Sequence, residues 1–215
     1  MELYSNIVAQ LALALGASWC AGINLYATIG VLGLMSRFAG FELPPGLEVL
    51  RSEWVIGAAV IMYCVEFFAD KIPAIDTAWD SVHTFIRIPA GAVLAATALG
   101  DVGPELQVAA ALIGGTLALG SHTTKATARV AAHATGISPV VSPAASLLED
   151  GMVVTTIAFL AAYPLVTLSL TAAMIVGSAV LLYFLWNVAR RVFRGLFGSH
   201  QNPVMMPPPP PTATA

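Results

Sequence analysis

The chain has 215 residues, of which 58% are hydrophobic and only 10% are charged, and its formal net charge is −3. Soluble domains carry about 25% charged residues, so this composition excludes an ordinary soluble domain. The weakly acidic charge gives no support for a nucleic-acid partner. The chain is therefore predicted to be an all-α integral membrane protein, a polytopic helical bundle with membrane lipids as partners.

Long apolar runs separated by turns predict about six transmembrane helices, since a helix that crosses a bilayer needs about 20 apolar residues. In chain order they cover residues 6–36, 53–70, 85–100, 105–127, 148–163 and 165–188. The first run is long enough to tilt or break, and its small-residue middle from Gly16 to Asn24 favours a kink. Ser142 is a candidate N-cap before the fifth span.

Residues 1–197 are predicted to form one transmembrane helical domain, and 198–215 a disordered, Pro-rich cytoplasmic tail. Three arginines follow the last span, at positions 190, 191 and 194. Because short cytoplasmic loops are enriched in basic residues, the C-terminus is predicted to lie in the cytoplasm. Six spans then place the N-terminus there too. The loop 37–52 fits this topology poorly, since it would lie outside despite Arg37 and Arg51.

Two polar stretches between the spans carry ionisable side chains at helical spacing. The first shares one face of a helix near residues 72–87, predicted to be amphipathic or re-entrant, and consists of Asp76, Asp80, His83 and Arg87. The second begins inside the fourth span and consists of His122, Lys125 and Arg129. The two faces are complementary in charge, so we expect Asp76 and Asp80 to meet Lys125 and Arg129.

Ionisable residues inside a membrane commonly mark ion or substrate pathways and proton relays. The sequence therefore predicts a polar vestibule on the cytoplasmic side, with Glu66 and Asn24 at its deeper end. The candidate residues are Asn24, Glu66, Asp70, Lys71, Asp76, Asp80, His83, Arg87, His122, Lys125, Arg129, Glu149 and Asp150. The structural alternative is that these charges pair only to hold the cytoplasmic helix ends together.

The predicted function is a small transporter or channel-like protein for an ion, a proton-coupled solute or an anionic lipid headgroup. One alternative is a membrane-embedded enzyme that acts on a lipid diphosphate through a metal held by Asp76 and Asp80. A companion Asp-rich motif, a zinc or iron ligand set and a phosphate-binding loop are all missing, which makes an enzyme the weaker hypothesis. The other alternative is a membrane scaffold or assembly factor. No cofactor is predicted, and a homo-oligomer stays open.

At these stretches the chain resembles an uncharacterised bacterial integral-membrane family, domain of unknown function 4126. The matching segments are Ala21-Gly-Ile-Asn24-Leu-Tyr26, Ala69-Asp70-Lys71-Ile-Pro73, Asp76-x-x-Trp79-Asp80-x-x-His83-Thr84-x-Ile-Arg87, His122-x-x-Lys125-Ala-x-x-Arg129 and Ser146-x-x-Glu149-Asp150. The resemblance implies a multi-pass protein, which we expect in the bacterial inner (plasma) membrane, and marks the polar stretches as signature residues. It implies no activity.

Overall fold

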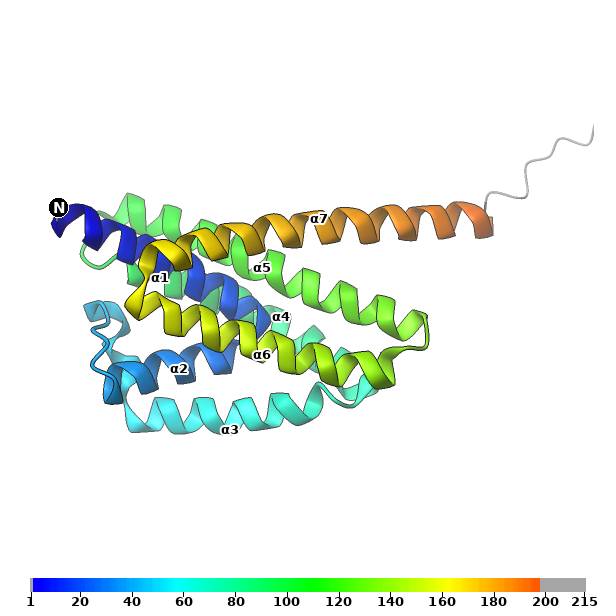
Figure 1. The fold of residues 1–215 in the computed structure, drawn as a ribbon, viewed down its shortest axis with the longest axis horizontal. Helices are drawn as coiled ribbons and strands as arrows, with labels where there is room; N and C mark the ends of the chain where they lie inside the picture. Colours follow the sequence, from blue (N-terminus) through cyan, green and yellow to red (C-terminus); the bar gives the residue numbers. More distant parts are fainter. Residues whose placement is uncertain (1, 198–215) are drawn as a thin grey trace, which may run out of the picture.

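The computed structural model describes residues 2–197, and within them it is an all-helical bundle, as predicted (Figure 1). The side chains of residues 2–5, 73, 74, 77, 138–142, 161, 192, 193 and 195–197 are not described. The elements are α1 (Glu2–Ile23), α2 (Leu25–Phe38), the short 3-10 helix η1 (Pro45–Arg51), α3 (Glu53–Ala69), α4 (Pro73–Ala98), α5 (Pro104–Ala134), α6 (Ser138–Ala162) and α7 (Pro164–Phe197). The predicted tail at 198–215 lies outside the described residues.

Local sequence explains most helix boundaries. Pro104 and Pro164 open α5 and α7, where the missing N–H of proline costs no helical hydrogen bond. The turns on either side of α5 contain Gly100 and Gly136, whose φ angles of 71° and 74° favour glycine. The prediction that Ser142 caps the start of a helix is wrong. Helix α6 begins four residues earlier, directly after the Gly136 turn, and contains Pro143 in its interior.

The predicted amphipathic segment 72–87 and the third span 85–100 are not separate helices. They form one helix of 26 residues, α4, which continues through Pro89. This helix packs along α1 and α5. The Ser18 hydroxyl of α1 donates a hydrogen bond of 2.8 Å to the Gly91 carbonyl. A Cβ atom at Gly91 would lie 3.0 Å from the Gly114 carbonyl of α5, so the two helices approach closely here. Close packing on both sides thus holds the helix together across the proline.

The chain reverses direction at Asn24, inside the bundle (Figure 1). Asn24 is extended and caps α2, its side-chain Oδ1 accepting a 2.9 Å hydrogen bond from the Ala27 N–H. As a result, the first residues of α1 lie beside the segment that follows α2, since Asn6 and Glu42 line the same pocket. A break between 16 and 24 was predicted, but the return of α2 beside α1 was not. We call α1 and α2 together the re-entrant pair.

The re-entrant pair changes the predicted topology. Figure 1 places the start of α1 and the end of α7 at opposite ends of the bundle, whereas six spans put both termini on the cytoplasmic side. The difference arises because α1 and α2 turn back where one crossing was expected. The turns α3–α4 and α5–α6 lie at the end toward which α7 runs, and the α4–α5 and α6–α7 turns lie at the other (Figure 1).

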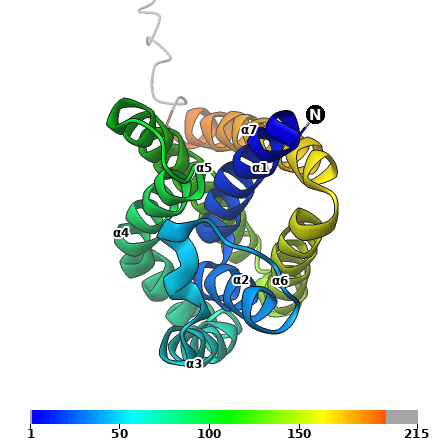
Figure 2. The ribbon, with the colours of Figure 1, turned by 90° about the vertical axis from the view of Figure 1, so that its left-hand side faces the viewer.

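By length and apolar composition, three helical segments could cross a membrane: Asn6–Ile23, Pro143–Leu160 and Pro164–Arg191. The pair η1 and α3, bent by 68°, could be a fourth. These apolar helices indicate a membrane protein, with fewer candidate spans than the six predicted. Helices α4 and α5 are long enough to cross a membrane, but each carries a polar face, and the charged residues of these faces are buried in the bundle. Viewed end-on, α1 lies innermost, and it contacts α2, α4, α5, α6 and α7 (Figure 2).

The topology is testable by cysteine labelling of intact and permeabilised cells, with the exposed Cys64 replaced by serine. We expect Asn6→Cys and Glu42→Cys to react from the same side of the membrane, because both residues lie at one end of the bundle. Thr135→Cys, in the α5–α6 turn, should react only from the opposite side. Reaction of Asn6→Cys and Thr135→Cys from the same side would contradict the re-entrant pair.

Candidate functional site

Three buried cations and five carboxylates form one connected site, which we call the ion network. Arg87, in the middle of α4, is fully buried. Its Nη2 atom is 2.5 Å from Glu66 Oε1, and its Nη1 atom is 3.3 Å from Asp80 Oδ1. Glu66 is also fully buried. A buried charge is tolerated only with partners of this kind, because an unpaired one is strongly destabilising.

Lys125 and Arg129, one turn apart on α5, continue the network toward α6. The Lys125 ammonium lies 3.1 Å from Asp70 Oδ2, 3.5 Å from Glu66 Oε1 and 3.6 Å from Glu149 Oε2. Arg129 lies 2.5 Å from Asp76, 2.8 Å from Glu149 and 3.0 Å from Asp70. Each cation therefore already lies beside two or three carboxylates.

Asp70 lies in the connection between α3 and α4, and its carboxylate pairs with both Lys125 and Arg129. Burial acts to raise the pKa of this carboxyl, but Lys125 and Arg129 outweigh burial and hold its pKa below the ordinary value. Asp70 is therefore ionised. The Ser146 hydroxyl of α6 donates a 3.5 Å hydrogen bond to Asp70 Oδ2, the oxygen that also lies beside Lys125 and Arg129.

The re-entrant pair ends on this network. Where α1 stops, the carbonyls of Gly22 and Ile23 accept hydrogen bonds from Arg87 Nη1 (3.4 Å) and Lys125 Nζ (3.2 Å). The last carbonyls of a helix lack helical partners and carry partial negative charge. Two buried cations thus satisfy the end of α1 in the interior of the bundle.

Asp150 differs from the other carboxylates because its hydrogen-bond donors are neutral. Its Oδ1 accepts from Asn24 Nδ2 at 2.9 Å, and its Oδ2 accepts from the Tyr63 hydroxyl at 3.0 Å. Asn24 therefore links the start of α2 to α6. The side chain of Asn24 is 2% exposed, so this link is enclosed.

Two of the candidate residues, His83 and His122, are histidines that contact neutral side chains near the ion network. His122 Nδ1 accepts from Arg87 Nη1 at 2.8 Å, which leaves Nε2 to carry the proton toward Thr84 Oγ1, 2.7 Å away. His83 is stacked on Trp79, with ring centroids 4.2 Å apart, and its Nε2 is 3.0 Å from the Tyr26 hydroxyl. His122 thus belongs to the network, and His83 lies beside it.

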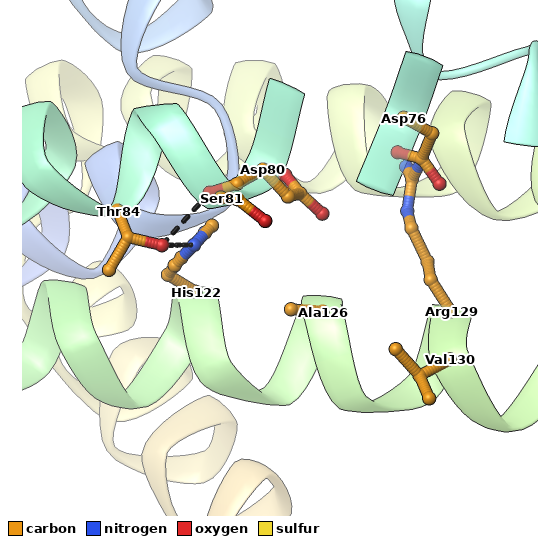
Figure 3. A pocket seen from close by; sticks show the side chains of 8 residues that line it. All are labelled: Asp76, Asp80, Ser81, Thr84, His122, Ala126, Arg129 and Val130. Carbon is orange, nitrogen blue, oxygen red and sulfur yellow. Dashed lines mark hydrogen bonds and ion pairs between the residues drawn. The ribbon is translucent and has the colours of Figure 1, made fainter. Parts of the chain in front are cut away.

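Two pockets border the network on opposite faces of α5. The first, of about 130 Å³, lies between α4 and α5 (Figure 3) and is called the α4–α5 pocket. Its lining residues are Asp76, Asp80, Ser81, Thr84, His122, Ala126, Arg129 and Val130. The second, of about 300 Å³, lies between α1, α5, α6 and α7 and is mostly apolar, with Lys125 and Glu149 on its wall.

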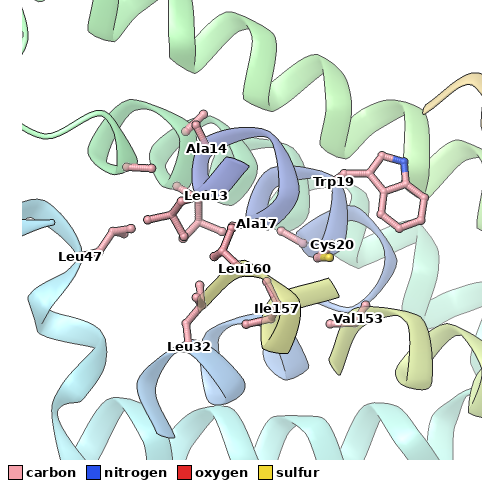
Figure 4. Close-up of a cluster of buried hydrophobic side chains, with 14 of the residues drawn as sticks. Leu13, Ala14, Ala17, Trp19, Cys20, Leu32, Leu47, Val153, Ile157 and Leu160 are labelled. Atoms are coloured by element: carbon pink, nitrogen blue, oxygen red, sulfur yellow. The ribbon is translucent and has the colours of Figure 1, made fainter. Parts of the chain in front are cut away.

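Apolar packing borders the network toward the start of α1. Leu13, Ala17 and Cys20 of α1 pack there with Leu32 of α2 and residues of α6 (Figure 4). Val153 and Ile157 are the fully buried contributions from α6. The polar site is therefore bordered at this end by an apolar core.

The predicted complementarity holds in part. Asp76 meets Arg129, as expected, whereas Asp80 pairs with Arg87 on its own helix and not with Lys125 or Arg129. Lys71 lies apart, its ammonium donating to the Phe67 carbonyl and lying 3.0 Å from the centroid of the Phe67 ring. Glu66, expected at the deeper end of the vestibule, is fully buried, and its carboxylate lies against Arg87.

Sequence reasoning included Asn24 among the candidate residues but missed other neutral partners of the site, Tyr63 and two backbone carbonyls. Tyr63 precedes Glu66 by three residues and so shares its helix face, a signal that could have been used. The carbonyls of Gly22 and Ile23 could not be foreseen, since their role depends on the reversal at Asn24.

The geometry does not favour the metal site considered for Asp76 and Asp80. Each carboxylate has an oxygen engaged by a different guanidinium, that of Arg129 or Arg87. Within residues 2–197, moreover, no group of three histidine, cysteine or acidic side chains is arranged to hold a metal ion.

Comparison with known proteins gives one match. The model of a family described as Domain of unknown function (DUF4126) matches residues 11–185. No curated protein and no solved structure matches the chain significantly. The matched range contains the whole ion network and the re-entrant turn.

Proposed function

Because the chain belongs to the DUF4126 family, whose description records no activity, we propose its function from the site: a small membrane transporter that moves a cation or a proton-coupled solute past the ion network. The proposal places it in the bacterial inner membrane, with the basic end of α7 in the cytoplasm. An enzyme or a scaffold finds no comparable support in the geometry.

The observation that carries the proposal is the interrupted helix at a buried ionic site. Transporters commonly place substrate and coupling-ion sites where discontinuous helices end near the membrane midplane, with free carbonyls and helix ends facing the site. Here α1 stops inside the bundle, and its terminal carbonyls contact Arg87 and Lys125. Charge pairs that only hold helix ends together would not require this break.

Charge balance favours a cation or protons over an anion. The network has five carboxylates and three cations, and each cation already has at least two acidic neighbours. An anionic headgroup would add negative charge to a site that already has an excess of it. A cation or proton would reduce that excess, which is costly in a low-dielectric interior.

The test is a flux assay with the purified protein in liposomes. An entrapped pH-sensitive dye reports proton entry driven by a potassium diffusion potential, and a parallel arm measures radiolabelled sodium uptake. We expect wild-type vesicles to exceed empty ones in at least one arm. Asn24→Ala and Lys125→Met should lower that flux about tenfold or more, a change of about 1.4 kcal/mol in the barrier.

Arg37→Gln is the matched control, since Arg37 pairs with Glu53 at the surface, far from the network. It should transport at the wild-type rate. A third arm follows fluorescent phosphatidylglycerol quenched by dithionite. Lipid flipping without cation flux would contradict the choice of a cation, and the absence of flux in every arm would overturn the transporter.

A further inference from the structure

The last turns of α7 carry three arginines that no carboxylate of the chain neutralises. Arg190, Arg191 and Arg194 are exposed, and none of them pairs with an acidic side chain in the described part of the chain. Residues 151–215 contain these three arginines, no lysine and no acidic residue. This part of the chain is therefore basic, although the whole chain has a formal net charge of −3.

The three arginines lie on one side of the helix. Arg190 and Arg194 are four residues apart, and Arg191 and Arg194 are three apart, spacings that make side chains neighbours on a helix surface. Arginine keeps its charge at any physiological pH, and like charges at these spacings lower the stability of a helix. The cluster therefore favours a counter-charge supplied from outside the chain.

The position of the arginines along α7 matches the headgroup layer of a bilayer. Pro164–Arg191 is long and apolar enough to cross a membrane, and at 1.5 Å per residue the rise from Pro164 to Arg190 is about 39 Å. The hydrocarbon core of a bilayer is about 30 Å thick, and the whole bilayer is about 40–45 Å. A helix that enters the core near Pro164 thus leaves it near Tyr183 and Trp186 and carries Arg190 among the headgroups.

The surroundings of this helix end support that depth. Tyr183 and Trp186 are 71% and 66% exposed, and both residue types are enriched where hydrocarbon meets water. Figure 1 shows α7 running past the α5–α6 turn, so its last turns lie clear of the other helices. Residues 130–148, which include that turn, contain no acidic residue either. Lipid headgroups can therefore reach the arginines without competition from the chain.

We propose that Arg190, Arg191 and Arg194 form a docking surface for anionic phospholipid headgroups, such as that of phosphatidylglycerol. Guanidinium groups bind phosphate oxygens through paired, charge-assisted hydrogen bonds. An anionic membrane surface also attracts basic residues that directly follow a span. The bound lipid supplies the counter-charge that the chain lacks and fixes the depth of α7 in the membrane. None of these arginines belongs to the ion network, so the inference does not depend on transport.

Native mass spectrometry of the purified protein in detergent measures the binding. The protein is titrated with phosphatidylglycerol or, in a second arm, with zwitterionic phosphatidylcholine of the same acyl chains. We expect the wild type to bind the first phosphatidylglycerol at least about tenfold more tightly than the first phosphatidylcholine, because each arginine near an anionic surface contributes about fivefold. This preference should shrink as the ammonium acetate concentration rises, since exposed charges are screened by salt.

Charge-matched variants locate the binding. Arg190→Gln combined with Arg194→Gln should lower the preference at least about fivefold. Arg37→Gln combined with Arg51→Gln also removes two exposed arginines, but from residues 37–53, a stretch that contains three glutamates, and should bind like the wild type. Arg190→Lys combined with Arg194→Lys keeps the charge and should keep most of the preference. All the substituted side chains are exposed, so each variant should unfold at the same SDS fraction as the wild type.

Three outcomes would overturn the docking surface. The first is a wild type without preference for phosphatidylglycerol. The second is a loss of preference that is equal in the two glutamine variants, because the binding would then depend on total charge and not on α7. The third comes from an arm in which inorganic phosphate competes with the lipid. Displacement at equal concentrations would show that the arginines bind free phosphate and not a membrane lipid.

Discussion

Replacing Arg87 with methionine is expected to destabilise the folded protein by about 3–5 kcal/mol. The side chain is fully buried, and its loss leaves Glu66 and Asp80 charged without their shared partner. The Gly22 carbonyl and His122 Nδ1 lose their donor in the same step. Methionine fills a similar volume, so most of the loss would come from the unpaired charge and not from a cavity. Unfolding in mixed micelles with increasing SDS measures the change.

Two further variants make this result specific. Arg37→Met removes an arginine from the exposed pair with Glu53 and should cost less than about 1 kcal/mol, the usual value of a surface salt bridge. Glu66→Leu combined with Arg87→Met removes both buried charges and should be more stable than Arg87→Met alone. If Arg87→Met unfolds at the same SDS fraction as the wild type, the network does not hold α3 to α4.

Gly22→Ala is expected to have the second large effect, by displacing the end of α1. A Cβ atom at position 22 would overlap the Ser121 hydroxyl and the Ala118 carbonyl of α5. One of these atoms is backbone and cannot turn aside, so α1 and α5 must separate. Overpacking of this kind costs about 1–3 kcal/mol. Separation would also weaken the hydrogen bond from Lys125 to the Ile23 carbonyl, so proton or sodium flux should fall together with stability.

Gly120→Ala provides the matched control. Gly120 lies on α5, and a Cβ atom there would meet nothing within 4 Å. Alanine should be neutral or stabilise the helix by up to about 1 kcal/mol, since glycine lowers helix stability by that amount. Equal stability and flux for the two variants would show that α1 does not approach α5 as closely as the structure has it.

The predictions from sequence succeeded where they depended on local pattern. Apolar runs located α3, α5 and α7 within a few residues, apart from the C-terminal extensions of the last two helices. The small-residue stretch before Asn24 marked the break in the first run. Its geometry was not predictable, because a capping asparagine indicates where a helix starts but not the direction in which it leaves.

The candidate residues show the same division. Regular spacing placed Asp76, Asp80 and Arg87 on one face of α4, and the inward turn of that face follows from the cost of exposing charges to lipid. Which charges pair was decided by tertiary contacts. Asp80 pairs with Arg87 on its own helix, whereas Asp150 accepts hydrogen bonds from Asn24 and Tyr63, which lie far from it in sequence.

By itself, the sequence determined an all-helical, lipid-compatible chain whose scarce charges gather on a few helix faces, because composition and periodicity act within one helix. Only the tertiary structure decided that α2 returns beside α1, that the end of α1 contacts Arg87 and Lys125, and that Asp80 pairs with Arg87 while Asp76 pairs with Arg129. These features depend on how helices distant in sequence pack, and packing is selected by the whole bundle rather than by any segment.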